Sequence, residues 1–302
     1  MSASPRQAEQ LLTRLEWTVV RRLDGLLQGD YRTLFRGIGL DFADLREYQV
    51  HDDIRHIDWN VTARTQVTHV RVYNEDREIT AWFLLDLSPS VDFGSGVANK
   101  RQVLTEFVAV LARLLTHQGN KVGVILFDGV SEHVVPPRVG RRHVLHMLDK
   151  ILAHPRLLRA PQTDLGAFLR RALSSIRRRS VLFVVSDFIS LPGWQEAISA
   201  VNQRHEAVAV RLVDPLEMAL PDIGLLAFED SESGEQVFVD TSDGSFRRRF
   251  ATDAARLEEA TMRAFARAGI DVLELSTEDD LLDAVVRFAG MRKAQARSGF
   301  LG

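Results

Sequence analysis

Residues 79–88, ITAWFLLDLS, decide the fold that this sequence favours. The run is almost continuously apolar over the length of one strand, and it ends in an acidic and a hydroxyl side chain. This pattern is typical of a strand that is buried on both faces of a parallel sheet, because a half-exposed strand alternates apolar and polar residues. We therefore expect a parallel sheet that carries polar groups where its strands end.

Outward from this strand, strand and helix patterns alternate along the chain. We expect further strands at 121–128, 180–187, 206–213 and 271–276, a short antiparallel strand at 131–136 and another short strand at 236–240. Helical stretches are expected at 98–117, 141–153, 164–177, 192–203, 248–268 and 278–290. The alternation predicts an α/β fold with a doubly wound, mostly parallel, Rossmann-like sheet, which binds ligands at the carboxyl ends of its strands.

The first eighty residues have a different pattern. Apolar residues recur at helical spacing within 6–28, and two short β-like runs follow around 60–65 and 67–73 beside a dense charged stretch. A segment this small and charged would not fold alone, so we expect it to pack on the sheet. Three parts are expected, namely an N-terminal helix with a small β-containing extension at 1–79, the sheet domain at 80–292 and a flexible tail at 293–302.

Composition excludes several classes of function. The 302 residues are 45% hydrophobic and contain no cysteine, which excludes disulfides, thiolate zinc sites, iron–sulfur clusters and a cysteine nucleophile. The net charge of −3 argues against nucleic-acid binding by bulk charge. The N-terminus lacks the apolar core of a signal peptide, and no run reaches the about 18 apolar residues of a spanning helix. We expect a cytoplasmic protein without a membrane span.

Hydroxyl and carboxylate side chains cluster at the predicted strand ends. Asp86, Ser88 and Ser90 leave the first strand at two-residue steps, which lets all three turn toward one point. Thr163 precedes a predicted helix, and Asp187 closes a later buried strand. Hard oxygen ligands suit Mg²⁺, Mn²⁺ or Ca²⁺. The combination predicts a divalent metal site, with Mg²⁺ as the expected ion.

Each member of this set also has a simpler interpretation. Ser, Thr and Asp residues that precede helices commonly accept hydrogen bonds from the first turn. Thr163 or Asp164 would cap the helix expected at 164–177, and Asp187 would cap a helix that begins near Leu191. The order of all the residues together is more specific than any single position, but the sequence leaves both interpretations open.

The five predicted metal residues resemble the metal-ion-dependent adhesion site of von Willebrand factor A domains, and the strand order from 80 to 290 fits that fold. The resemblance implies that the hydroxyls of Ser88, Ser90 and Thr163 bind the cation, directly or through water. It implies that Asp86 and Asp187 complete the shell mostly through bridging waters. One position is then left for an Asp or Glu of a partner protein.

A second resemblance covers about residues 30–290. Residues 41–64, DFADLREYQVHDDIRHIDWNVTAR, with RVYNE at 71–75 and VDPLE at 213–217, are similar to the bacterial family called domain of unknown function fifty-eight (DUF58). The chain resembles its shorter members that lack N-terminal membrane helices. The resemblance implies a partnership with a MoxR-type AAA+ ATPase in the assembly or maturation of other protein complexes.

The charged segment within 41–64 has two interpretations. Its arginines and carboxylates would fix an irregular segment through bidentate pairs. Alternatively, the segment is an exposed docking surface whose expected partner-binding residues are Arg46, Tyr48, Arg55, Trp59 and Arg64. A metal site from Asp52, Asp53 and Asp58, or a zinc site from His51 and His56, has little support because the spacing matches no known ligand pattern.

Two function hypotheses follow. The first is a non-enzymatic, divalent-metal-dependent protein-interaction module that acts as adaptor or co-chaperone between a MoxR-type ATPase and a client that bears an acidic residue. The alternative is a metal-dependent hydrolase or phosphatase that uses the Asp86 cluster. Ser88 stands where an aspartyl-phosphate enzyme is expected to have a second Asp, and neither a Ser–His–Asp order nor a nucleotide-binding glycine motif is visible.

Overall fold

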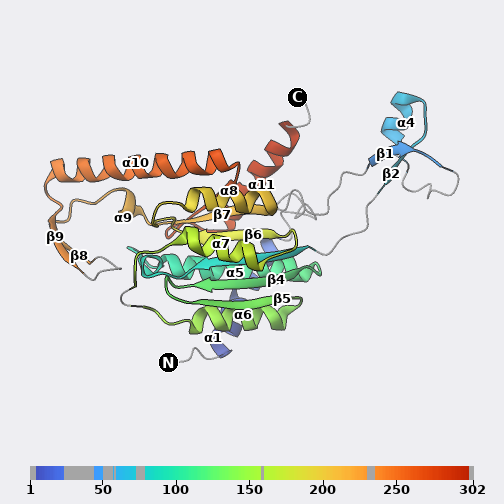
Figure 1. Cartoon of the computed structure of the whole chain (residues 1–302). Helices are drawn as coiled ribbons and strands as arrows, with labels where there is room; N and C mark the ends of the chain where they lie inside the picture. The colour runs from blue at the N-terminus through green and yellow to red at the C-terminus, as the bar shows by residue number, and fades with distance from the viewer. Residues whose placement is uncertain are drawn as a thin grey trace.

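The computed structural model describes residues 5–23, 44–49, 57, 59–72, 79–157, 160–229 and 235–298. Its centre is a six-stranded sheet in the order β10-β7-β6-β3-β4-β5 (Figure 1). The strands are β3 (Thr80–Asp86), β4 (Lys121–Phe127), β5 (Glu132–Arg138), β6 (Val181–Ser186), β7 (Glu206–Val213) and β10 (Asp271–Ser276). All neighbours are parallel except the antiparallel edge strand β5. This mostly parallel α/β sheet confirms the predicted fold class.

Helices cover both faces of the sheet (Figure 1). They are α5 (Lys100–His117), α6 (Arg141–Ala153), α7 (Leu165–Ser175), α8 (Trp194–Arg204), α10 (Gly244–Ala268) and α11 (Leu281–Ser298). Phe83 and Leu85 of β3 belong to a core that includes α5, α6 and α11, whereas Leu84 belongs to a core with α7, α8 and α10. Successive side chains thus enter opposite cores, which explains why this strand is continuously apolar.

The N-terminal helix packs on helices of the sheet domain. Helix α1 (Pro5–Leu15) continues as a π-helical turn over Glu16–Val20 and contacts α5 and α6. Leu12, Leu15 and Leu23 are buried in the core on that face of the sheet. No helix within the described ranges is both long and apolar enough to cross a bilayer.

The extension holds a small antiparallel pair, β1 (Asp44–Glu47) with β2 (His69–Val72), and helix α4 (Trp59–Thr65). The prediction of a β-like run around 60–65 is wrong, because these residues form α4. β-Branched residues disfavour a helix only weakly, and here local hydrogen bonds support it. Thr65 Oγ1 donates to the Val61 carbonyl at 3.0 Å, and the His69 amide donates to Thr62 Oγ1 at 3.1 Å.

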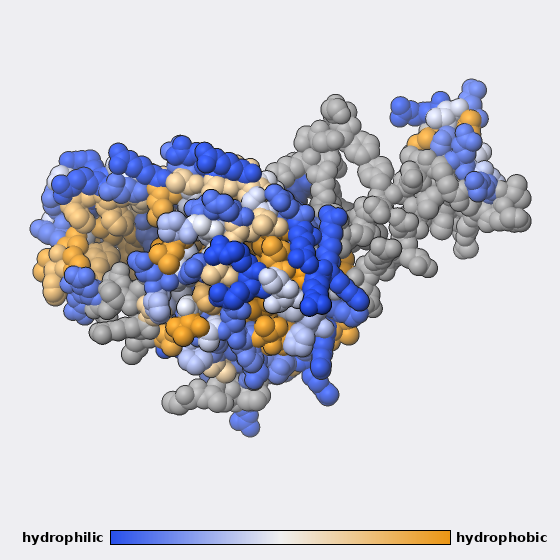
Figure 2. All heavy atoms as spheres, in the orientation of Figure 1, coloured by the Kyte–Doolittle hydropathy of each residue, from blue (hydrophilic) through white to orange (hydrophobic). Residues whose placement is uncertain are grey.

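The polar segment after β7 contains more structure than predicted. It forms α9 (Pro215–Met218), β8 (Leu225–Glu229) and the expected β9 (Gln236–Asp240), which pairs with β8. This hairpin exposes apolar side chains, with Leu225 at 69% and Phe238 at 67% exposure, and Figure 2 shows apolar surface over it.

Two helix boundaries differ from the predictions. Helix α10 begins at Gly244 rather than 248, because the Asp243 side chain accepts a hydrogen bond from the Ser245 amide and caps the helix there. Helix α11 runs to Ser298, beyond the end predicted at 290 and into the segment predicted as a tail.

Candidate metal centre

Asp86 lies where two neighbouring strands end together. Strands β3 and β6 are parallel, with Leu85 opposite Val185, so Asp86 and Ser186 are adjacent strand ends. Asp86 is fully buried. Its Oδ2 accepts a hydrogen bond from Ser186 Oγ at 2.7 Å, and its Oδ1 accepts one from the Ser88 amide at 3.0 Å. This carboxylate therefore joins the two strand ends and orients the loop that follows β3.

The two serines of this loop lie next to each other. Ser88 Oγ is 3.2 Å from Ser90 Oγ, and the 3₁₀ turn at Pro89–Asp92 folds the chain back so that the Val91 amide donates to the Ser88 carbonyl at 3.0 Å. Ser88 is fully buried, whereas Ser90 is partly exposed. The predicted convergence of Asp86, Ser88 and Ser90 is therefore present, with Ser90 nearest to solvent.

The loop before α7 is attached to the loop after β6. The carbonyl of Thr163 accepts hydrogen bonds from Ser190 Oγ at 2.7 Å and from the Leu191 amide at 2.9 Å, and the Thr163 side chain is fully buried. Asp164 caps α7 by accepting from the Ala167 amide at 2.7 Å. The capping interpretation therefore holds for Asp164, which leaves Thr163 without a capping role.

Asp187 follows β6 and is also buried. Its Oδ1 accepts from the Ile189 amide at 3.0 Å, and its Oδ2 accepts from Lys100 Nζ at 2.8 Å. Helix α8 begins at Trp194 with Gly193 at its N-cap, so the interpretation of Asp187 as a helix cap is wrong. Both oxygens of this carboxylate already accept hydrogen bonds from the protein.

The electrostatics of the centre favour a cation. Burial and the neighbouring negative charge of Asp187 raise the pKa of Asp86 from 3.8 to about 6, despite the hydrogen bonds from Ser186 and Ser88. A carboxylate that is hard to ionise because of a second carboxylate is relieved by a positive charge placed between them. The hydrogen bonds from Ser186 and Ser88 do not fully stabilise ionised Asp86, and a cation beside it would add the missing stabilisation.

Lys100, which no sequence pattern predicted as part of this site, is fully buried at the start of α5. Its ammonium bonds Asp187 Oδ2 at 2.8 Å and Glu217 Oε1 at 2.6 Å. Burial lowers the pKa of Lys100, but attraction by Asp187 and Glu217 outweighs it and leaves the pKa above its ordinary value. The sequence contains one indication that Lys100 is unusual. Lysine is rare in this chain, with residues at positions 100, 121, 150 and 293 among 38 basic residues.

Glu217 reaches Lys100 from helix α9. This helix begins with a capping box in which the Asp214 side chain accepts from the Leu216 amide at 3.0 Å and Glu217 Oε2 accepts from the Asp214 amide at 3.0 Å. Asp214 Oδ2 also accepts from the Ser95 amide at 2.9 Å and from Thr277 Oγ1 at 2.8 Å. These contacts fix the segment after β7 against the loops after β3 and β10.

The donor set fits a hard divalent cation. Hydroxyl and carboxylate oxygens are the groups that Mg²⁺, Mn²⁺ and Ca²⁺ prefer. In the ranges that the structure covers, no three His, Cys, Asp or Glu side chains group as metal ligands. A centre here would therefore depend on the hydroxyls of Ser88, Ser90 and Thr163 and is unlike a zinc site of histidines or thiolates.

The predicted docking residues lie in the extension. Trp59 is 69% exposed on α4, Arg64 of the same helix is exposed, and Tyr48 is half-buried. Arg46 belongs to β1. Residues 51–56, which include Arg55 and both histidines considered above, lie outside the described residues, as does residue 58. Trp59 and Arg64 are thus available to a partner.

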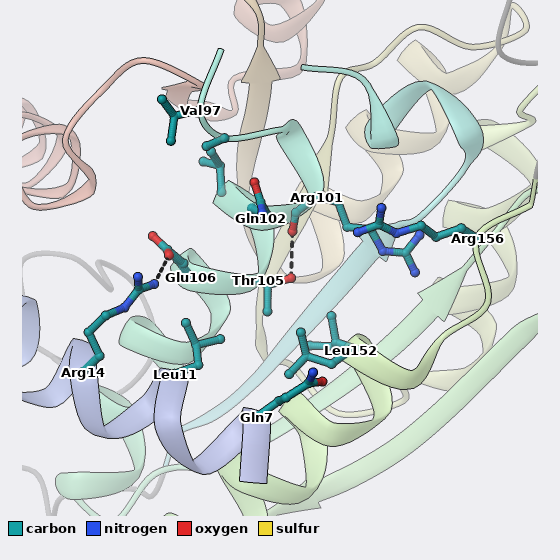
Figure 3. Close-up of a pocket in the computed structure, with 13 residues that line it drawn as sticks. Gln7, Leu11, Arg14, Val97, Arg101, Gln102, Thr105, Glu106, Leu152 and Arg156 are labelled. Carbon is teal, nitrogen blue, oxygen red and sulfur yellow. Dashed lines mark hydrogen bonds and ion pairs between the residues drawn. The ribbon is translucent and has the colours of Figure 1, made fainter. Parts of the chain in front are cut away.

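A separate cavity of about 500 Å³ lies between α1, α5 and the end of α6 (Figure 3). Leu11, Arg14 and Leu152 are among its lining residues, and Arg14 pairs with Glu106 across it. None of the five predicted metal residues lines this cavity. The cavity therefore does not belong to the metal centre.

The chain is similar to known proteins. A family model described as "Protein of unknown function DUF58" matches residues 44–260. The uncharacterized protein Rv1480 of Mycobacterium tuberculosis is 36% identical over 295 residues, which cover 98% of this chain and 92% of that protein.

Two solved structures are similar at low sequence identity. The conserved hypothetical protein BatB of Bacteroides thetaiotaomicron is 15% identical with a TM-score of 0.45, over 72% of this chain and 99% of that one. The VWA domain of SpRpn10 is 12% identical with a TM-score of 0.39, over 69% of this chain and 94% of that one.

Proposed function

Because the chain belongs to the DUF58 family of proteins of unknown function, we propose its role from the geometry of its own metal centre. The proposal is a non-enzymatic, divalent-metal-dependent protein-interaction module. It acts as an adaptor or co-chaperone with a MoxR-type AAA+ ATPase in the assembly or maturation of other protein complexes. The observation that carries it is the convergence of Asp86, Ser88 and Ser90 beside Asp187 at the carboxyl ends of the strands, here called the carboxyl edge of the sheet.

The residues divide into two roles in this proposal. Ser88, Ser90 and Thr163 hold the cation with their hydroxyl oxygens. Asp86 and Asp187 act mostly through water, because all four of their carboxylate oxygens already accept hydrogen bonds from the protein. A bound Mg²⁺ supplies positive charge and a coordination position for an acidic side chain of the client. Partly exposed Ser90 is where that side chain approaches.

The same geometry disfavours the hydrolase alternative. A nucleophilic carboxylate needs an oxygen that substrate can reach. Asp86 has no exposed surface, and both of its oxygens accept hydrogen bonds. Buried His205 precedes β7 and therefore lies at the amino ends of the strands, whereas the metal centre lies at their carboxyl ends. It is not positioned to serve as a base for this centre. Recognition therefore suits the centre better than catalysis.

The proposed partners are of two kinds. The client contributes an Asp or Glu to the metal centre. The ATPase is proposed from the family resemblance, and the exposed Trp59 and Arg64 offer a large aromatic ring and a guanidinium of the kind that anchor protein interfaces. We place the complex in the cytoplasm, where the ATPase has its nucleotide.

The test is an affinity purification from cell extract in the presence of Mg²⁺, with bound proteins identified by mass spectrometry. Wild type is compared with Asp86→Ala and with Asp164→Ala, a matched control that removes the same carboxylate from a helix cap. We expect the Asp86 variant to lose the AAA+ ATPase or a distinct client while the control keeps both. Circular dichroism of both variants tests whether they are folded.

Two results would overturn the proposal. Identical partner lists for wild type and Asp86→Ala would exclude the metal centre as the recognition element. Hydrolysis of phosphoesters by the purified protein with Mg²⁺ or Mn²⁺, abolished by Asp86→Ala, would establish the hydrolase instead.

A further inference from the structure

Lys100 brings a positive charge of the protein's own into the candidate metal centre. The backbone at the start of α5 is fixed by a capping box between Asn99 and Gln102, so the position of Lys100 is well defined. Its side chain is fully buried and ends between Asp187, at the end of β6, and Glu217, in α9. A lysine is buried this completely only when its charge is paired.

The charges around this ammonium are unequally shared. Two carboxylates, those of Asp187 and Glu217, bond the ammonium, and a third, that of Asp86, interacts electrostatically with Asp187. Lys100 bonds Asp187 and Glu217, whereas the hydrogen bonds to Asp86 come from the neutral groups of Ser88 and Ser186. The lysine thus neutralises one side of the centre and leaves negative charge at the other, beside the paired hydroxyls of Ser88 and Ser90.

We propose that Lys100 is a resident cation that sets how tightly the centre binds a divalent metal, because its ammonium and the metal compete for Asp187. This inference rests on the metal site of the proposed function. The ammonium holds Asp187 Oδ2, and two positive charges near one carboxylate repel each other. Lys100 therefore keeps the affinity of the free centre below that of the same oxygen donors without it.

Glu217 adjusts this competition. It shares the ammonium with Asp187, at 2.6 Å and 2.8 Å respectively, and so draws part of the positive charge away from the centre. Removal of the Glu217 charge directs the whole ammonium to Asp187 and weakens metal binding. Removal of both Lys100 and Glu217 charges frees Asp187 without a change in net charge. The two substitutions therefore have opposite effects, which a purely structural ion pair does not predict.

The experiment is a titration of the purified full-length protein with Mn²⁺, followed by electron paramagnetic resonance of the free ion. We compare wild type, Glu217→Gln and the double variant Lys100→Met with Glu217→Gln. Lys121→Met, the same substitution at the first residue of β4 and the opposite edge of the sheet, is the matched control. We expect the double variant to bind Mn²⁺ about tenfold more tightly, Glu217→Gln about threefold more weakly, and Lys121→Met as wild type does.

The outcomes separate this inference from the function on which it rests. Equal affinities in wild type and the double variant, or loss of binding in the double variant, would overturn the role of Lys100 while the metal centre stands. Absence of Mn²⁺ binding in wild type and variants alike would overturn both. Should the double variant fail to fold, the Mn²⁺ affinity of Glu217→Gln alone tests the role of Lys100. This variant should fold, because the Glu217 side chain is 25% exposed and the Lys100–Asp187 pair remains.

Discussion

Acidic residues surround one basic residue both at the amino ends of the strands of the central sheet (the amino edge) and at their carboxyl ends (the carboxyl edge), but the two clusters are built differently. At the amino edge, Glu206 and Asp271 are the first residues of β7 and β10, and Arg292 of α11 bonds both. Arg292 Nη2 lies 3.0 Å from Glu206 Oε1, and Arg292 Nε donates to Asp271 Oδ2 at 2.8 Å. At the carboxyl edge, Lys100 bonds Asp187 and Glu217, while Asp86 is held by neutral donors.

The difference separates a structural charge cluster from one that can take a ligand. The planar guanidinium of Arg292 bonds both acids of the amino edge. The single ammonium of Lys100 leaves Asp86 beside two hydroxyls, and the pKa of Asp86 is raised to about 6 by burial and by Asp187. Glu206 at the amino edge also has a raised pKa, about 7, but its bonded partner is a guanidinium, whereas Asp86 lies beside serine hydroxyls of the kind that bind a hard cation.

The largest expected effect is that of Lys100→Met alone. It leaves Asp187 and Glu217 without their shared cation, and a broken buried pair costs about 3–5 kcal/mol of unfolding free energy. Urea denaturation measures the loss, with Lys121→Met as the control that should stay close to wild type. A loss below about 1 kcal/mol would mean that the carboxyl edge tolerates unpaired carboxylates and would weaken the contrast between the two edges.

The next effect concerns Glu206 at the amino edge. Burial raises its pKa from 4.5 to about 7, even though Arg292 opposes the shift. A raised folded-state pKa means that the associated stability is fully present below about pH 4.5 and is lost as the pH rises through about 7. Glu206→Gln should therefore match wild type near pH 4.5 and exceed it by about 1–3 kcal/mol at pH 8.

Urea denaturation of both proteins at these two pH values measures the difference. A Gln variant that is less stable than wild type at pH 8 would show that the ionised Glu206–Arg292 pair stabilises the fold, which is the opposite of the predicted effect.

A smaller effect is the pH dependence of metal binding. Asp86 favours cation binding only when it is ionised, and the pKa of Asp86 is about 6. Affinity for Mn²⁺ should therefore be constant above pH 7 and fall by about tenfold for each pH unit well below 6. Titrations at pH 5, 6 and 7.5 test this, and Glu206→Gln should leave the profile unchanged because it lies at the other edge. Equal affinity at pH 5 and 7.5 would show that Asp86 does not contribute.

The smallest effect distinguishes a cap from a ligand within one loop. Asp164→Ala removes the N-cap of α7 and should cost about 1 kcal/mol of unfolding free energy. Mn²⁺ affinity should be unchanged, in contrast to Thr163→Ala, which removes a proposed ligand from the preceding residue. Thermal unfolding and Mn²⁺ titration of both variants measure this. Weaker Mn²⁺ binding in the Asp164 variant would assign that carboxylate to the metal centre.

Much of the fold was predictable because its elements are encoded locally. The apolar run that ends at Asp86 and the four other parallel strands were each expected within a few residues of their observed bounds. The convergence of Asp86, Ser88 and Ser90 was also predictable, since two-residue spacing acts within one loop. Helix α4 was mispredicted because its Thr-rich sequence, WNVTART, has weak helical propensity and depends on hydrogen bonds made by Thr62 and Thr65.

By itself, the sequence determined the order of strands and helices and the positions of the polar groups at the strand ends. Both follow from periodicity and spacing within short segments, which set local geometry. Only the tertiary structure decided which basic side chain pairs with Asp187, Glu217 and Glu206. Lys100 lies 87 residues from Asp187 and 117 from Glu217, and Arg292 lies 86 from Glu206. These pairings depend on how distant elements pack, and no local pattern records them.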